Sequence, residues 1–217
     1  MTKYRGYALL MLFSAGISLS ITFMLKAAVG VGAYDAFMQS LSLLSGIQIG
    51  TISMFLNFLF ILGQLIILKG KFEYHRLLQI PLSIFIGIMV NFFYYNLFAT
   101  VQLNNYVVSM TAYILALVLA AFSVSMVMVL NLVTFPMESL CMALTKVVPL
   151  SFAVIRQVAD ILYVVVAVAL TFAFDLPPSV REGTVIGMLI FGPLIGFFIE
   201  KVHPILTEKG IAQEVRA

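Results

Sequence analysis

Arg156 and Asp160 are the pair of side chains in this sequence whose types and spacing are best suited to chemistry. They lie four residues apart in an otherwise apolar segment, so on an α-helix they share one face and can form an ion pair. At a rise of ~1.5 Å per residue, Asp160 lies roughly 13 Å along the helix from Ser151. That depth is close to the middle of a ~30 Å hydrocarbon core. Such a pair either stabilises helix packing or lines a polar cavity that binds an ion, a proton or a small solute.

Asn57 is another polar residue in an apolar segment, and it aligns with Asp160 when the chain is compared with itself at an offset of 103 residues. It lies roughly 12 Å along its helix from Ile49, counted from the opposite surface if the second half is inverted. A charge at the centre of a membrane helix costs about 2.5–3.5 kcal/mol on insertion scales, so we do not expect Asp160 to face lipid. Asn57 either joins the same site or forms an interhelical hydrogen bond worth ~0.6–2 kcal/mol.

Asp35 and Glu138 align at the same offset, and each follows a helix breaker, Gly32 in one case and Pro136 in the other. Pro136 suits the first position of a helix, where its missing N–H would have no partner. An acid in the first helical turn gains ~0.3–1 kcal/mol from the helix dipole. The two segments are therefore either interfacial helices with favourable N-termini or re-entrant helices that line a central cavity from opposite sides.

The elements that must position these residues are apolar helices. Hydrophobic residues make up 63% of the chain, charged residues only 10%, and the mean hydropathy is +1.13, far outside the range of soluble domains. A span needs ~20 apolar residues, and the last of the candidate segments is marginal by this measure. The sequence predicts an all-α polytopic membrane protein forming one transmembrane domain over residues 1–217, with about six spans: Tyr7–Leu25, Ile49–Leu68, Ile80–Ala99, Tyr106–Leu130, Phe152–Phe174 and Thr184–Ile199.

The two halves of the chain resemble each other. Besides the polar pairs above, the segment Gly87–Phe93 aligns with Gly192–Phe198 at an offset of 105 residues. Repeat 1 covers about residues 7–99 and repeat 2 about residues 106–202. Three spans per half is an odd number, so the second copy must cross the membrane in the opposite direction. We predict a 3+3 inverted repeat with two short amphipathic or re-entrant helices, a construction common among transporters.

The basic residues predict the orientation. If the N-terminus is cytoplasmic, Arg181 lies outside and Lys26 at the outer end of the first span. The positive-inside rule then places both termini in the cytoplasm. Because these residues act as topology signals, we predict no nucleic-acid partner. The inside segments carry most of the basic residues: Lys3, Arg5, Lys69, Lys71, Arg76, Lys146, Lys201, Lys209 and Arg216.

Several short motifs together resemble a known family. In the first half they are Gly30-Val31-Gly32-Ala33-Tyr34-Asp35-Ala36-Phe37 and Gly46-Ile47-Gln48-Ile49-Gly50-Thr51; in the second half they are Pro136-Met137-Glu138, Arg156-Gln157-Val158-Ala159-Asp160, Gly183-Thr184 and Gly192-Pro193. This set resembles the YczE/YyaS/YitT-type bacterial membrane proteins, nearest the YczE-like branch, over nearly the whole chain. Tyr34 stands where the family pattern has Trp after Pro, and Glu138 where Asp is more usual. The resemblance implies a multi-pass protein of the bacterial inner (cell) membrane, without an activity.

The sequence shows no Gly-rich phosphate loop, nucleophile elbow or paired-carboxylate arrangement, and Cys141, His75 and His203 match no metal-ligand pattern. We therefore predict no enzyme activity, no metal and no cofactor. The predicted partners are the lipid bilayer, a small-molecule or ion substrate, and either a second copy or a partner subunit.

We predict a secondary transporter of a small solute or ion, with Asp160, Arg156 and Asn57 at mid-depth and Asp35 and Glu138 at the two cavity mouths. The alternative is a non-transporting accessory or substrate-binding membrane subunit that works with other proteins. A transporter should contain a polar, water-accessible cavity between its halves, whereas an accessory subunit should have a dry core and an exposed face of small residues.

Overall fold

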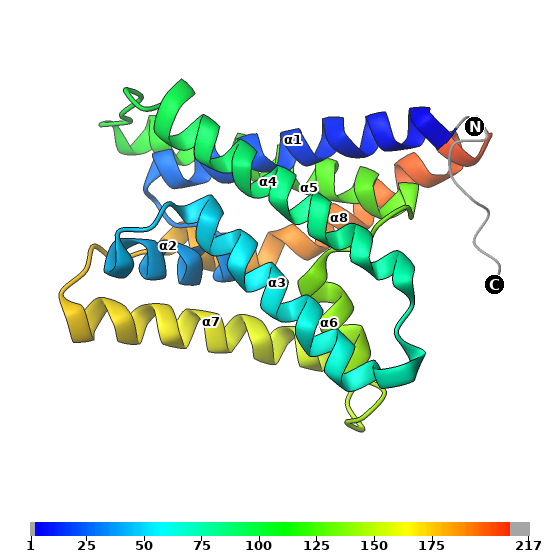
Figure 1. The fold of residues 1–217 in the computed structure, drawn as a ribbon. Coiled ribbons are helices and arrows are strands. Elements are labelled where there is room, and N and C mark those ends of the chain that lie inside the picture. Colours follow the sequence, from blue (N-terminus) through cyan, green and yellow to red (C-terminus); the bar gives the residue numbers. More distant parts are fainter. Residues whose placement is uncertain (1–2, 209–217) are drawn as a thin grey trace.

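The protein is an all-α polytopic membrane protein, as the sequence predicts. A computed structural model describes residues 3–208 (Figure 1); Lys209 and Arg216, which the sequence places inside, lie outside these residues. Within this range six helices are long and apolar enough to cross a membrane. The α-helices over the same residues are α1 (Lys3–Ala27), α2 (Ala33–Ser45), α3 (Ile49–Leu68), α4 (Gln79–Asn91), α5 (Tyr106–Leu130), α6 (Pro136–Leu144), α7 (Phe152–Phe174) and α8 (Glu182–Glu208).

The boundaries of α3, α5 and α7 match the predicted spans. The third span is composite, because a 3-10 segment over Tyr74–Leu78 precedes α4 and a π-helical segment over Phe92–Leu97 follows it. In the π-helical segment the Phe98 N–H donates to the Phe93 carbonyl, five residues back, at 2.9 Å. The helical geometry therefore changes within the predicted span Ile80–Ala99, although the span itself is present.

The last helix is longer than predicted. Instead of ending at Ile199, α8 runs on to Glu208 and contains both Pro193 and Pro204. Each proline removes one helical hydrogen bond, a loss that transmembrane helices tolerate where neighbouring groups compensate. Leu206 in the added segment is buried and packs against Met126 and Val129 of α5, which explains why the helix continues.

The eight helices form two groups. In the first, α1 packs against α4 and α5, and α5 packs against α8; in the second, α2 packs against α7, and α6 against α3. Figure 1 shows these groups one above the other. The groups are joined mainly along α3 and α4, whereas α7 and α8 have no comparable packing in the described part of the chain.

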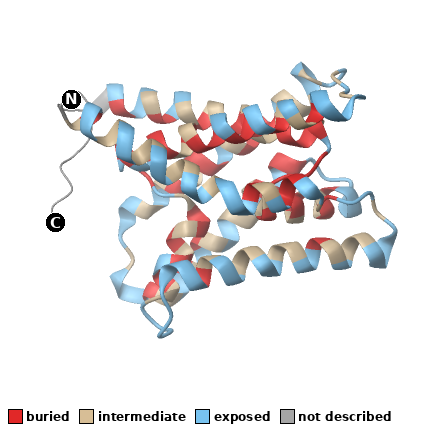
Figure 2. Cartoon of the chain, turned by 180° about the vertical axis from the view of Figure 1, so that it is seen from behind, coloured by how far each residue is buried: buried red, intermediate tan, exposed pale blue. Residues whose placement is uncertain are grey.

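Burial differs strongly between the helices. Figure 2 shows buried residues concentrated in the first group and at the start of α2, while α7 is exposed along most of its length. Only Ile155 and Ala167 are buried among the residues of α7. Its exposed residues are mostly large and apolar, such as Leu162 and Val165. A helix with this pattern is suited to contact with the hydrocarbon of a bilayer.

The helices of the two halves begin at a constant spacing. Their first residues are numbers 33 and 136 for α2 and α6, 49 and 152 for α3 and α7, and 79 and 182 for α4 and α8. Every pair is thus separated by 103 residues.

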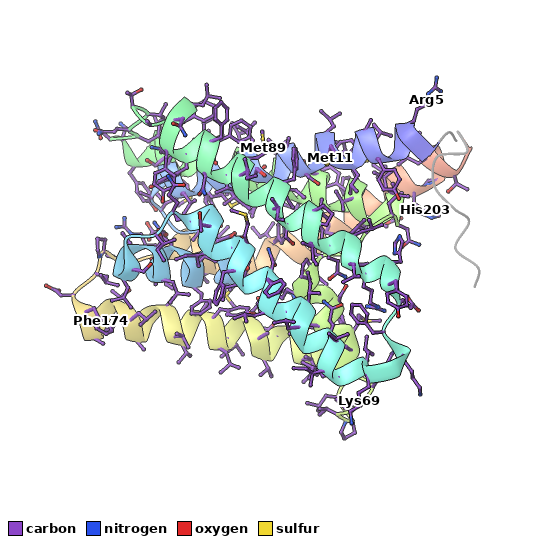
Figure 3. All side chains as sticks on the ribbon, viewed as in Figure 1. Arg5, Met11, Lys69, Met89, Phe174 and His203 are labelled. Carbon is purple, nitrogen blue, oxygen red and sulfur yellow. The ribbon has the colours of Figure 1, made fainter. Side chains whose placement is uncertain are left out.

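The ends of the spans also follow a pattern: Figure 3 shows Arg5, Lys69 and His203 toward one end of the molecule and Phe174 at the other.

The crossing of α3 and α4 brings two backbones into contact at Gly50 and Gly87. A Cβ at Gly50 would lie 2.0 Å from the Gly87 carbonyl oxygen. The Gly50 N–H also donates to Asn91 Oδ1 at 2.8 Å, and Asn91 Nδ2 donates to Thr51 Oγ1 at 3.0 Å. We call this contact the α3–α4 seam, and a larger residue at Gly50 would force the two helices to shift apart.

We expect Gly50→Ala to lower the free energy of unfolding by about 1–3 kcal/mol, the usual cost of overpacking. The matched control is Gly192→Ala in α8, because a Cβ at Gly192 meets nothing within 4 Å. Thermal unfolding of both variants in detergent measures the difference. Equal stability of the two variants would contradict the close packing of the α3–α4 seam.

Candidate functional site

Arg156 of α7 lies at the centre of a charged cluster. Its Nη1 donates to Asp160 Oδ1 at 2.5 Å, so the ion pair indicated by their spacing is present. Its Nε lies 3.9 Å from Glu138 Oε1 of α6, and Nη1 also lies 3.2 Å from the sulfur of Met137. One guanidinium therefore links α6 to the first third of α7.

Asp35 of α2 completes the cluster. It lies within electrostatic range of both Arg156 and Asp160, although it forms no ion pair within 4.0 Å in the described part of the chain. We define the charged cluster as Asp35, Glu138, Arg156 and Asp160. It unites side chains from both sequence halves, and it contains three carboxyl groups and one guanidinium.

The cluster is only partly buried within the protein. The side chains of Arg156, Asp160 and Glu138 are 29%, 20% and 37% exposed. Lipid offers no hydrogen bonds to such groups, and charged residues in spans almost always face the bundle interior or a water-filled cavity. The exposed parts of these side chains therefore need water, a polar ligand or another polar group beside them.

Asn57 does not join the charged cluster through a hydrogen bond. Its Nδ2 donates instead to Ser53 Oγ, one turn earlier on α3, at 3.4 Å. The sequence left two roles open for Asn57, an interhelical hydrogen bond or a place in the binding site of Asp160. The contact with Ser53 lies within α3 and is neither of these. Asn57 remains a candidate by sequence alignment, whereas the other four predicted residues are brought together.

An aromatic group lies beside the charged cluster and was not identified from the sequence. The ring centroids of Tyr34 and Tyr163 are 5.5 Å apart, Tyr163 stacks on Phe37 at 5.4 Å, and Tyr34 lies 5.9 Å from Phe60. Both tyrosines are within electrostatic range of Glu138. Helical spacing could have indicated Tyr163, which is seven residues after Arg156 and three after Asp160.

The local sequence explains where α2 and α6 begin. Gly30 adopts φ +121°, a conformation that glycine allows at little cost, and α2 starts three residues later. α6 starts at Pro136. The capping residues are Gly32 and Phe135, and neither forms a side-chain capping hydrogen bond. Asp35 and Glu138 thus occupy the first helical turns without being the N-caps.

The packing of the short helices favours the re-entrant alternative over the interfacial one. α2 lies along α7, and its first turn faces Asp160 and Tyr163 rather than either end of α7. Thirteen residues extend ~20 Å, which is also roughly the distance from Asp160 to Phe174. α2 therefore begins at the depth of the charged cluster and runs toward the end of α7.

Two sets of hydrogen bonds hold the starts of these helices. Before α2, the Val31 N–H donates to Thr184 Oγ1 at 3.2 Å and the Gly183 N–H donates to the Val29 carbonyl at 2.8 Å. Before α6, Gln79 Nε2 donates to Thr134 Oγ1 at 3.1 Å and to Ser139 Oγ at 2.9 Å. Gln64 Nε2 donates to the Pro136 carbonyl at 3.0 Å. The first turn of α8 thus anchors α2, and the first turn of α4 anchors α6, so each short helix is held by a long helix of the other half.

We expect Asp35→Asn and Glu138→Gln to cost less than about 1 kcal/mol each in stability, because the acids contribute through the helix dipole and not as caps. If the acids take part in binding, both variants will accumulate in the membrane but fail to complement a deletion strain. Asp175→Asn, which removes an exposed carboxylate in the turn after α7, is the matched control. Full complementation by both cluster variants would remove Asp35 and Glu138 from the site.

Comparison with known proteins gives one family. The model of a family of unknown function (DUF6198) matches residues 4–200, which is nearly the whole chain. Searches of the curated proteins and of the solved structures gave no match. The chemistry of the charged cluster must therefore be interpreted from its own geometry.

Proposed function

Since the chain belongs to the DUF6198 family, whose function is unknown, we propose from its geometry that it is a secondary transporter of a small solute or ion. The observation that carries this proposal is the charged cluster, which contains an ion pair inside the span α7 and joins residues of both halves. Charged residues at such a depth mark substrate, ion or proton pathways in membrane proteins. No enzyme activity is part of the proposal.

The proposed architecture is the inverted repeat. The constant spacing of 103 residues between helix starts supports it. So does the packing, because α1 with α4 has its counterpart in α5 with α8, and α3 with α6 has its counterpart in α7 with α2. The anchoring hydrogen bonds of Gln79 and Thr184 are a further matching pair. Binding sites of inverted-repeat transporters lie where the repeats meet.

One pair of equivalent contacts is asymmetric, as alternating access requires. The α3–α4 seam is closed by Gly50, Gly87 and Asn91. The equivalent residues of the second half are Ala153, Gly192 and Gly196, and α7 and α8 are not packed together there. A Cβ at Gly192 or Gly196 meets nothing within 4 Å. We propose that this difference marks a state that is closed at one end of the molecule and open at the other.

The positive-inside rule gives the proposed direction. With both termini in the cytoplasm of a bacterial cell, the α3–α4 seam would lie at the outer end, and the unpacked start of α7 would lie toward the inside. We also propose that the chain is related to the YczE/YyaS/YitT-type proteins that its motifs resemble.

The second candidate, an accessory or substrate-binding subunit, is favoured by the broad apolar exposure of α7, which a partner subunit could cover.

Water accessibility distinguishes the two candidates. In a Cys141→Ser background, we expect Ala159→Cys, which is half-buried on the face of Arg156, to react with an impermeant maleimide added from the cytoplasmic side. Leu162 is 56% exposed on an apolar stretch of α7 suited to lipid contact, so Leu162→Cys should remain unlabelled. Asn104→Cys and Gly70→Cys serve as outer and inner reference positions. Labelling of neither Ala159→Cys nor Leu162→Cys from either side would indicate a dry core and favour the accessory subunit.

A further inference from the structure

We infer that the charged cluster binds an organic cation, a substituted ammonium group, through Asp35, Tyr34 and Tyr163. This inference rests on the proposed function for the location of the site and adds the class of its substrate. Four observations carry it: the charge balance of the cluster, the aromatic rings beside it, a buried hydroxyl group without a partner, and the spacing of the carboxyl groups.

The charge balance favours a cation. Arg156 is already engaged by Asp160 at 2.5 Å and lies 3.9 Å from Glu138, so its positive charge is shared between two acids. Asp35 has no ion pair of its own within 4.0 Å in residues 3–208. Opposite charge stabilises an ionised carboxyl group, and a bound cation would provide it. An anionic substrate would instead have to displace Asp160 from the guanidinium.

The aromatic rings favour an organic cation over a small hydrated one. Tyr34 and Tyr163 meet edge to face at an angle of 61°, and Phe37 stacks against Tyr163. An ammonium group within ≈6 Å of a ring centroid is attracted to the ring by its quadrupole, and more strongly where the site is desolvated. Several rings next to carboxyl groups form the usual environment for substituted ammonium ligands.

The Tyr34 hydroxyl group adds an acceptor at the same place. Its oxygen is buried and forms no hydrogen bond of good geometry in the described part of the chain, although Ser53 lies near it. The same side chain is within electrostatic range of Asp35 and Glu138. A buried hydroxyl group without a partner destabilises the fold, and a donor on a ligand would remove that cost.

The spacing of the carboxyl groups does not suit a metal ion. Among residues 3–208, no three His, Cys, Asp or Glu side chains lie close enough together to hold one. The three acids are instead distributed over α2, α6 and α7. Such a distribution can surround a group several ångströms wide, as a substituted ammonium is.

The test compares choline with its uncharged isostere, 3,3-dimethylbutan-1-ol, on the purified full-length protein in lipid nanodiscs. We expect choline chloride to raise the unfolding temperature in a saturable manner, and we expect no shift from the isostere or from sodium chloride at equal ionic strength. Equal shifts with sodium chloride would assign the site to an inorganic cation. No shift with choline, or equal shifts with the isostere, would also overturn the inference.

Variants connect the binding to these residues. We expect Asp35→Asn and Tyr163→Leu each to weaken choline binding at least tenfold, which corresponds to 1.4 kcal/mol. Tyr163→Phe keeps the ring and should bind nearly as the native protein does, which also shows that the site folds. Asp175→Asn removes a carboxylate outside the cluster and should leave binding unchanged. Unchanged binding in Asp35→Asn and Tyr163→Leu would place the cation elsewhere.

The binding experiment and the accessibility experiment fail separately. Choline binding to a protein whose Ala159→Cys variant is never labelled would support a substrate-binding subunit and keep the inference. Labelling of Ala159→Cys without choline binding would support transport and refute the cation.

Discussion

Arg156→Gln will lower the free energy of unfolding by about 3 kcal/mol, the lower end of the ~3–5 kcal/mol that breaking a buried ion pair costs. The lower end applies because the side chains of Arg156 and Asp160 remain 29% and 20% exposed. Removing the guanidinium leaves three carboxyl groups of the charged cluster without their only cation. The double variant Arg156→Gln with Asp160→Asn removes one charge of each sign, so most of the stability should return.

The control is the pair of Arg76 and Glu73, which are 3.9 Å apart with Glu73 73% exposed. Arg76→Gln should cost no more than ~1 kcal/mol, as exposed pairs do. Thermal unfolding in detergent measures the stability of the native protein, of both single variants and of the double variant. Equal losses in Arg156→Gln and Arg76→Gln would show that the cluster does not depend on its guanidinium.

Activity separates the two interpretations of the same pair. If Arg156 and Asp160 only stabilise packing, the double variant will both fold and complement a deletion strain. If they take part in binding, the double variant will fold and remain inactive. We expect it to be stable and inactive; full activity would assign the pair to packing alone.

Locking the α3–α4 seam will abolish transport. Thr51 and Asn91 are hydrogen bonded at 3.0 Å across the seam, so Thr51→Cys with Asn91→Cys in the Cys141→Ser background should form a disulfide readily. Alternating access moves one bundle of helices against the other. Because α3 belongs to one of the two helix groups and α4 to the other, a covalent bond at the seam prevents that movement. Uptake into proteoliposomes should fall to background on oxidation and return on reduction.

The equivalent pair in the second half is the matched comparison. Ala153→Cys with Gly192→Cys joins α7 to α8, which are not packed together in this state. This pair should cross-link slowly, only when the molecule visits its other state, and substrate should change the rate. Normal uptake by the oxidised Thr51/Asn91 protein would contradict the movement of the seam, and with it the proposed mechanism.

The sequence alone determined the class of protein, the number of spans and the boundaries of α3, α5 and α7. These features depend on local properties, because in a bilayer every backbone polar group must be satisfied within its own helix and the apolar length must match the hydrocarbon. The pair of Arg156 and Asp160 was predictable for the same reason, since four residues on one helix fix their separation. The continuation of α8 past Ile199 was not predicted, because it is accompanied by packing of Leu206 against α5, a contact between distant parts of the chain.

Only the tertiary structure decided which of these residues meet. Asp35 and Glu138 come from helices about a hundred residues apart, and no local rule places both beside Arg156 or puts Tyr34 against Tyr163. Asn57 was a candidate that the structure did not bring into the cluster. Its alignment with Asp160 predicts how deep the side chain lies along its helix but not which way it points, and its amide donates to Ser53. The closed α3–α4 seam and the unpacked α7 and α8 were likewise beyond the sequence. Which helices pack together depends on the packing energy of the whole molecule, and no local pattern reports it.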